Sequence, residues 1–137
     1  MCADESSVKR LVFGSVDREN RNTVTDEAVK QLKEYFAGKR KSFTVPVDPD
    51  GTEFQKTVWK SLMTVPYGET RTYKDMAKEI GNDKAFRAVG NANGANPIPI
   101  IIPCHRVVAS SGKLGGYSAG LFRKIYLLRH ERRYGAK

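Results

Sequence analysis

One stretch, residues 96–108, restricts the fold of this chain more than any other feature. Its three prolines, at positions 97, 99 and 103, remove backbone donors and exclude an α-helix. Its three consecutive isoleucines, at 100–102, favour an extended, buried path. Cys104 and His105 follow directly in this apolar run. The sequence therefore predicts an irregular, rigid segment that carries a cysteine and a histidine.

Two short helices are predicted just before this stretch. Thr72 and Asp75 have the spacing of a capping box, and an apolar stripe follows as far as Gly81. Asp83 can cap a further helix over residues 84–93, directly after a tight turn. Two helices joined in this way are typical of a helix-turn-helix.

Two longer helices flank this region. A helix starting at Thr52 is predicted because apolar residues repeat at i, i+4 and i+8 from Phe54 onwards. A last helix is predicted to end near Glu131. Its apolar face would hold Leu121, Ile125 and Leu128.

The N-terminal residues predict a small α/β unit. A short strand is expected over residues 8–13, and a helix capped by Thr25 should extend to Gly38. Its apolar face would consist of Val29, Leu32 and Phe36. Residues 39–51 contain two prolines and several charges, which predicts a linker.

The expected fold class is therefore α/β (α+β). Residues 1–50 are expected to form a reduced N-terminal α/β segment and linker, and residues 51–137 a mainly helical domain with a winged-helix-like helix-turn-helix. A chain of 137 residues suffices for one main hydrophobic core.

The positive charge is concentrated in the second part of the chain. Residues 1–50 hold nine Lys and Arg against nine Asp and Glu, whereas residues 51–137 hold fifteen against six. A basic domain favours a polyanionic partner because neutralised phosphates release counterions. Charge alone leaves nucleic-acid binding at about even odds.

The sequence does not predict a membrane protein, a secreted protein, a metalloprotein or a disulfide-stabilised protein. No apolar run approaches the ~20 residues of a membrane span, and the N-terminus lacks the pattern of a secretory signal. We expect an intracellular protein, nuclear in a eukaryote and cytoplasmic in a prokaryote. Two cysteines and two histidines without metal-ligand spacing predict neither a metal site nor a disulfide framework, and Cys2 is expected to be an incidental thiol.

Cys104 has the neighbours that a nucleophilic cysteine needs. A free thiol is mostly protonated at neutral pH, and adjacent imidazole or cationic groups raise the thiolate fraction. His105 follows it directly, and Glu131 could hold the imidazole in one tautomer. From the residues alone, a buried structural cysteine, a core histidine and a solvated glutamate remain the alternatives.

The segment Pro103–Val108, preceded by Asn96 and Pro97 and followed by residues 116–118, strongly resembles the O6-alkylguanine-DNA alkyltransferases, also called methylated-DNA–protein-cysteine methyltransferases. The resemblance covers residues 54–131. It also includes three other segments in the same order: residues 66–68 with 72–73, residues 87–90 and residues 124–131.

The resemblance implies a single-use DNA-repair enzyme. Such a methyltransferase removes the alkyl or methyl group from O6-alkylguanine in double-stranded DNA and keeps it irreversibly on a cysteine, after base flipping through the minor groove. This suicide reaction requires no cofactor, and we expect a monomer.

The resemblance also implies a role for each matching catalytic residue. Cys104 would accept the alkyl group, with His105 linked to it through a water molecule and Glu131 orienting His105. Asn96 would brace the active-site turn by hydrogen bonds. Tyr73 would donate a hydrogen bond to the guanine ring and help to rotate the base.

Further residues would bind the DNA and the flipped base. Arg87 would fill the gap in the base stack, and small residues, among them Ala88 and Gly90, would let its helix enter the minor groove. The Ser118 backbone N–H and the Tyr117 phenol would line the guanine pocket, with Lys124 behind Tyr117. The carbonyls of Cys104 and Val107 would accept from the guanine amino group.

Two alternative functions involve no catalysis: a non-catalytic alkyl-lesion-binding protein and a helix-turn-helix regulator. Cys104 disfavours the first, and the second leaves the set Asn96, His105, Tyr117 and Glu131 unexplained. A thiol hydrolase would need an oxyanion hole that the sequence does not indicate. The chain departs from the family in its short N-terminal part and in Ala119, where glycine is frequent.

Overall fold

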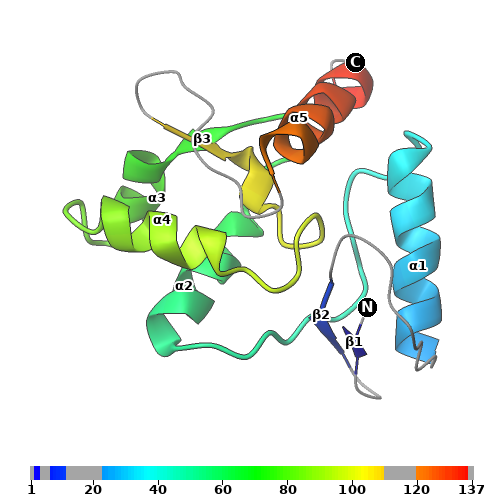
Figure 1. The fold of residues 1–137 in the computed structure, drawn as a ribbon, viewed down its shortest axis with the longest axis horizontal. Coiled ribbons are helices and arrows are strands. Elements are labelled where there is room, and N and C mark those ends of the chain that lie inside the picture. Colours follow the sequence, from blue (N-terminus) through cyan, green and yellow to red (C-terminus); the bar gives the residue numbers. More distant parts are fainter. Residues whose placement is uncertain (1, 4–6, 12–22, 110–119, 136–137) are drawn as a thin grey trace.

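The computed structural model describes residues 2–3, 7–11, 23–109 and 120–135. Within these ranges, helices dominate and the strands are short, arranged as two separate two-stranded sheets. Figure 1 shows the first strands and helix on one side of the molecule and the remaining helices on the other. This mixed architecture confirms the predicted α+β class.

The N-terminal part consists of a small antiparallel sheet beside one helix. β1 (Cys2–Ala3) pairs with β2 (Val8–Arg10), and both contact α1 (Thr23–Phe36). The strand predicted from Val8 is present, and the predicted helix begins two residues before Thr25. Gly38 follows α1 with a φ of 76°, and a Cβ there would lie 2.4 Å from the Tyr134 ring, so glycine is required.

The buried face of α1 differs from the predicted one. The prediction placed Phe36 inside, but this residue is 40% exposed, whereas Gln31 and Tyr35 are buried. Gln31 accepts hydrogen bonds from the backbone N–H groups of residues 44 and 45, and Tyr35 donates to a buried carboxylate. Polar side chains with such partners can be buried, and apolar periodicity cannot indicate them.

Residues 39–51, predicted as a linker, are tied to β2. The Val8 N–H donates to the Pro46 carbonyl at 2.7 Å, and the Asp48 N–H donates to the Val8 carbonyl at 2.9 Å. The side chain of Val45 is buried in the core. The segment therefore crosses between the two parts of the chain as a packed connection.

Two helices begin with capping boxes, of which the one at Thr72 was predicted. α2 (Glu53–Leu62) is capped by Thr52 and α3 (Tyr73–Glu79) by Thr72, each with a complete capping box. α2 contributes Val58, Trp59 and Leu62 to the core. Each reciprocal pair of hydrogen bonds satisfies N–H groups that would otherwise lack a partner.

The second helix of the helix-turn-helix starts later than predicted. α4 (Phe86–Gly94) begins after Ala85, and no side chain caps it, so the predicted cap at Asp83 is wrong. Residues 83–85 form a turn, which separates Asp83 from the first turn of α4. α4 packs on both α2 and α3, and the Trp59 indole N–H donates to the Ala92 carbonyl at 2.8 Å (Figure 1).

The proline-rich stretch is irregular and buried, but it is not extended throughout. Ile98, Ile101 and Ile102 are buried in the core, and Ile100 adopts a positive φ of 73°. The chain then forms the 3-10 helix η1 (Cys104–Arg106). β4 (Val107–Val108) follows and pairs in parallel with β3 (Arg71–Thr72), which leads directly into α3.

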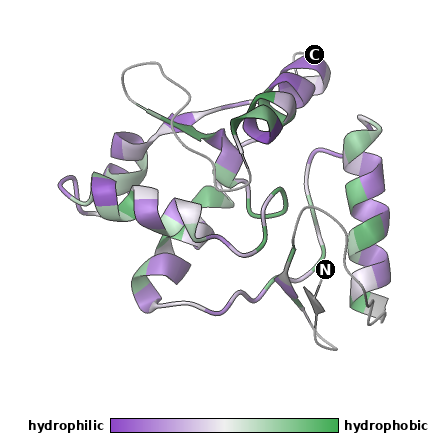
Figure 2. Cartoon of the chain, viewed as in Figure 1, coloured by the Kyte–Doolittle hydropathy of each residue, from purple (hydrophilic) through white to green (hydrophobic). Residues whose placement is uncertain are grey.

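α5 (Leu121–Gly135) extends beyond the predicted end at Glu131. Its buried residues are Lys124, Leu127, His130 and Glu131. Leu121, predicted to lie on the buried face, is 51% exposed. The prediction failed because this helix buries charged groups against η1, and Figure 2 shows that much of its C-terminal half is hydrophilic.

No helix in the described ranges combines the length and apolar character that a membrane crossing requires.

The capping box of α2 generates the first prediction. Thr52→Ala should lower the free energy of unfolding by about 1 kcal/mol, because it removes the side-chain acceptor for the Gln55 N–H. Thr57→Ala is the matched control, because Thr57 lies inside the helix and bonds only back to the Glu53 carbonyl. Urea unfolding of both variants checks the difference, and equal losses would contradict the role of the cap.

Candidate active site

Cys104 lies at the start of η1 and is only 3% exposed. Two asparagine side chains fix the backbone around it. Asn93 Nδ2 donates to the Cys104 carbonyl at 3.2 Å, and Asn96 accepts from the Ile98 N–H and donates to the Ile102 carbonyl, both at 2.9 Å. Asn96 thus closes the turn that leads to the cysteine, whereas the contact from Asn93 was not anticipated.

A buried carboxylate organises the residues after Cys104. Glu131 Oε2 lies 2.7 Å from His105 Nε2, and both side chains are almost completely buried. Arg106 donates through Nε to Oε1 at 2.8 Å and through Nη2 to Oε2 at 2.9 Å. The structure therefore brings His105 and Glu131 together. A carboxylate in this position can orient an imidazole for proton transfer.

Two further donors reach the same carboxylate. The Tyr35 hydroxyl donates to Oε2 at 2.7 Å, and the Gly68 N–H donates to Oε1 at 3.3 Å. Sequence reasoning assigned no role to Arg106, although it lies inside the motif. It also missed Tyr35, which no local signal could connect to Glu131, 96 residues away.

The protonation states of this network follow from burial and hydrogen bonding. Burial alone would raise the pKa of Glu131, but hydrogen bonds from His105 and Arg106 outweigh it and hold this pKa well below its usual range. Burial lowers the pKa of His105, although the hydrogen bond to Glu131 opposes this effect. At neutral pH the site therefore holds a carboxylate beside a neutral imidazole.

The tautomer of His105 follows from its partner. An ionised carboxylate can only accept, so Nε2 of His105 must carry the proton that it donates to Glu131. Nδ1 is then the basic nitrogen, and it is buried without a hydrogen-bond partner among the described residues. His105 can therefore receive a proton only at Nδ1.

The charge of Cys104 affects the pKa of two more titratable side chains, Tyr73 and Lys124. Burial first, and then a negative charge on Cys104, raise the pKa of Tyr73, so its phenol remains a donor. Burial lowers the pKa of Lys124 to about 8, while Cys104 acts in the opposite direction. Lys124 Nζ donates to the Val107 carbonyl at 2.7 Å, so one lone pair of this carbonyl is occupied.

The predicted DNA-contacting residues lie on α4. Arg87 and Ala88 are exposed at its start, and Gly90 is half-buried. A Cβ at Gly90 would lie 3.8 Å from the Tyr73 ring, an ordinary contact distance. The predicted pocket residues Tyr117 and Ser118, together with Ala119, lie outside the described residues.

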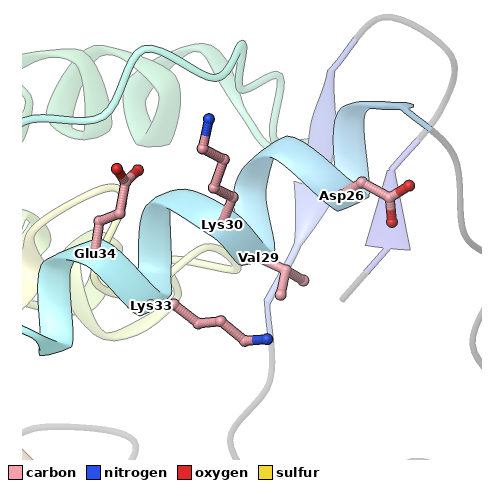
Figure 3. A pocket seen from close by; sticks show the side chains of 5 residues that line it. All are labelled: Asp26, Val29, Lys30, Lys33 and Glu34. Carbon is pink, nitrogen blue, oxygen red and sulfur yellow. The ribbon is translucent and has the colours of Figure 1, made fainter.

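A separate hollow of about 580 Å³ lies on α1. Figure 3 shows that its lining comes from this helix alone. The lining residues are Asp26, Val29, Lys30, Lys33 and Glu34. The lining includes neither Cys104 nor any residue hydrogen-bonded to Glu131, so this hollow is separate from the candidate active site.

No cluster of three or more potential metal-ligating side chains occurs within the described ranges. The residues around Cys104 supply proton donors and acceptors, and the chemistry they support is that of an activated thiol.

The buried carboxylate generates a stability prediction. Glu131→Gln should lower the free energy of unfolding at pH 7 by about 3 kcal/mol, because the Arg106 guanidinium would be buried without its ionic partner. The depressed pKa of Glu131 stabilises the fold above the unfolded carboxyl's pKa of about 4.3, and this contribution is lost as the pH falls through the folded value. The variant should lack this acid-dependent loss.

Urea unfolding between about pH 7 and pH 3 measures both effects. Glu69→Gln is the control, because its carboxylate is 54% exposed in an ion pair with Arg71 and should contribute less than about 1 kcal/mol. Equal losses in the two variants would show that the buried network has no special energetic role.

Comparisons with known proteins agree with this geometry. Residues 53–133 match the family model "6-O-methylguanine DNA methyltransferase, DNA binding domain", and residues 1–49 match its "ribonuclease-like domain". A methylated-DNA–protein-cysteine methyltransferase of Methanosarcina acetivorans is 61% identical over 105 residues, covering 77% of this chain and 67% of the relative. The same enzyme of Methanosarcina mazei is 49% identical over 96% of this chain and 88% of the relative.

The structural comparison gives the same result. The crystal structure of Mycobacterium tuberculosis OGT in complex with DNA superposes with a TM-score of 0.87 at 46% identity, covering 97% of this chain and 85% of that one. With both parts of the chain matched and the buried network around Cys104 in place, this protein belongs to the 6-O-methylguanine DNA methyltransferase family.

Proposed function

We propose that this protein repairs alkylated DNA by moving the alkyl group, typically methyl, from O6 of guanine to Sγ of Cys104 in one irreversible step. The observation that carries the proposal is that His105, which directly follows the buried Cys104, is hydrogen-bonded to Glu131. A carboxylate that fixes an imidazole beside a thiol is the arrangement by which thiols are activated.

The proton inventory of the proposed reaction is balanced. The Cys104 thiol passes its proton to Nδ1 of His105, directly or through a water molecule. The thiolate attacks the alkyl carbon, the S–C bond forms, and the C–O6 bond breaks. The electron pair of the C–O6 bond remains on the guanine, which takes a proton from the Tyr73 phenol. The His105 imidazolium then releases its proton, which returns through solvent to the Tyr73 phenolate.

The raised pKa of Tyr73 supports its part in this step, because a phenol that stays protonated can donate to the leaving guanine. Glu131 stays ionised and stabilises the imidazolium without taking its proton, since its pKa lies below the usual range. Asn96 fixes the turn that presents Cys104.

Access to a base in a duplex requires that the base leave the stack. α4 presents the exposed Arg87 near its N-terminus, next to the small residues Ala88 and Gly90. We infer that α4 enters the minor groove and that Arg87 fills the space left by the base. The substrate is then double-stranded DNA, bound by one monomer. We also propose a cytoplasmic location, which the prokaryotic origin of the relatives named above supports.

Intact mass measurement tests the reaction itself. Incubation with excess duplex containing O6-methylguanine should add one methyl group to the Cys104 peptide, and repaired DNA should plateau at one equivalent of protein. A thioether has no good leaving group, so the alkyl group should stay on Cys104. Cys104→Ser should abolish transfer and retain most of the DNA affinity.

The matched control is Cys2→Ser, which should react like the wild type. Methyl transfer to Cys2, or turnover beyond one equivalent, would refute the proposal. DNA binding without any transfer would instead indicate a non-catalytic lesion-binding protein.

A second prediction concerns Arg87. Arg87→Ala should slow repair in duplex DNA by at least about tenfold, because the unstacking cost of a few kcal/mol is no longer offset. Its reaction with free O6-benzylguanine should change by less than about twofold, since no base stack is opened. Single-turnover rates on both substrates provide the measurement.

Lys84→Ala serves as the control for loss of charge, because Lys84 is also exposed and precedes α4. It should weaken DNA affinity without a specific loss of the rate at saturating duplex. Equal losses for Arg87→Ala on both substrates would assign Arg87 a structural role.

A further inference from the structure

Tyr35 connects the N-terminal part of the chain to Cys104, His105 and Glu131, the proton relay of the proposed reaction. It lies on α1, is completely buried, and donates its phenolic proton to Glu131 Oε2 at 2.7 Å. The same oxygen lies 2.7 Å from His105 Nε2. Tyr35 and His105 therefore compete for the lone pairs of one carboxylate oxygen.

The position of the Tyr35 phenol is fixed at several points. The Tyr35 carbonyl lies 2.7 Å from His130 Nε2, so consecutive residues of α5 hold its backbone and its hydroxyl. Its ring packs against His130, Phe43 and Tyr67, with centroid distances of 5.0, 5.6 and 5.9 Å. A phenol held in this way is preorganised toward Glu131.

We propose that Tyr35 is a positioning residue of the relay, which holds Glu131 Oε2 in place and limits how strongly this carboxylate attracts the His105 proton. Residues 1–50 then help to set the basicity of His105. This inference rests on the proposed function, because it assigns His105 the task of accepting the thiol proton.

The physical argument concerns the charge on one oxygen. Each donor to a carboxylate withdraws part of its negative charge and stabilises the ionised form. When one neutral donor is removed, the oxygen becomes a stronger acceptor for the donors that remain. His105 would then hold its second proton more firmly, because the imidazolium would face a more basic carboxylate.

Tyr35 can act only as a donor. Burial and then the adjacent negative charge of Glu131 raise the pKa of Tyr35 far above its ordinary value. Its phenol therefore stays protonated throughout the range in which His105 titrates. Tyr35 exerts a constant influence on the relay and does not itself exchange protons.

Other charged and titratable groups face the pair from each packed element. Arg106 of η1 binds both oxygens of Glu131, and Lys124 of α5 acts on His105 through its charge. Tyr67, in the turn after α2, also interacts electrostatically with Glu131. Cys104 precedes His105. All of these remain unchanged in a Tyr35 variant, so the test isolates one hydrogen bond.

The test is an NMR titration of the imidazole nitrogens in wild type and Tyr35→Phe. The chain has only two histidines, His105 and His130, so the signals of His105 can be assigned. Tyr35→Phe keeps the ring and the backbone contact but removes the donor. The titration midpoint of His105 should move to higher pH by about 0.5 to 1 unit, and the acid limb of the methyl-transfer rate should move with it.

Tyr67→Phe is the matched control. The Tyr67 hydroxyl is buried in the same aromatic cluster but has no hydrogen-bond partner among the described residues. Its removal should leave the His105 midpoint in place. Replacement of Tyr35 by 3,5-difluorotyrosine gives a stronger donor of nearly the same shape, and it should move the midpoint to lower pH.

Three outcomes would overturn the proposal: an unchanged His105 midpoint in Tyr35→Phe, the same change in Tyr67→Phe, or no opposite change with the fluorinated residue. If Tyr35→Phe does not fold, the fluorinated protein alone decides, because it keeps the hydroxyl. The titration needs no DNA, so its result is independent of whether Cys104 accepts a methyl group.

Discussion

Glu131 carries a buried negative charge to which groups from three other segments donate hydrogen bonds. A carboxylate that leaves water must be compensated by donors and an opposite charge, or the fold loses several kcal/mol. The compensation comes from η1, from the turn after α2 and from α1, all meeting on α5. The site therefore forms only when four segments that are distant in the sequence pack together around one side chain.

The same low-polarity surroundings prepare the reactive groups. Burial keeps the His105 imidazole neutral, so it can accept a proton, and keeps the Tyr73 phenol protonated, so it can donate one. Lys124 is buried with its pKa lowered to about 8. Cys104 itself is almost completely buried. An alkylated base must therefore leave the DNA stack and enter the protein to reach the thiol.

The N-terminal part contacts the active site although Cys104 lies outside it. Its connection, residues 39–51, is hydrogen-bonded to β2, and the Leu11 N–H donates to the Pro97 carbonyl of the proline-rich stretch. Tyr35 then reaches the relay directly. The N-terminal part thus supports the rest of the chain through the proline-rich stretch and through α5.

Neighbouring residues alone specify several features of this chain. The capping boxes at Thr52 and Thr72, the irregular path forced by the prolines, and the adjacency of Cys104 and His105 all follow from neighbouring residues. Tertiary structure decided the start of α4, the buried faces of α1 and α5, and the donors that surround Glu131. The physical reason is that a polar group can be buried only where distant partners satisfy it, and such partners leave no periodic signal in the chain.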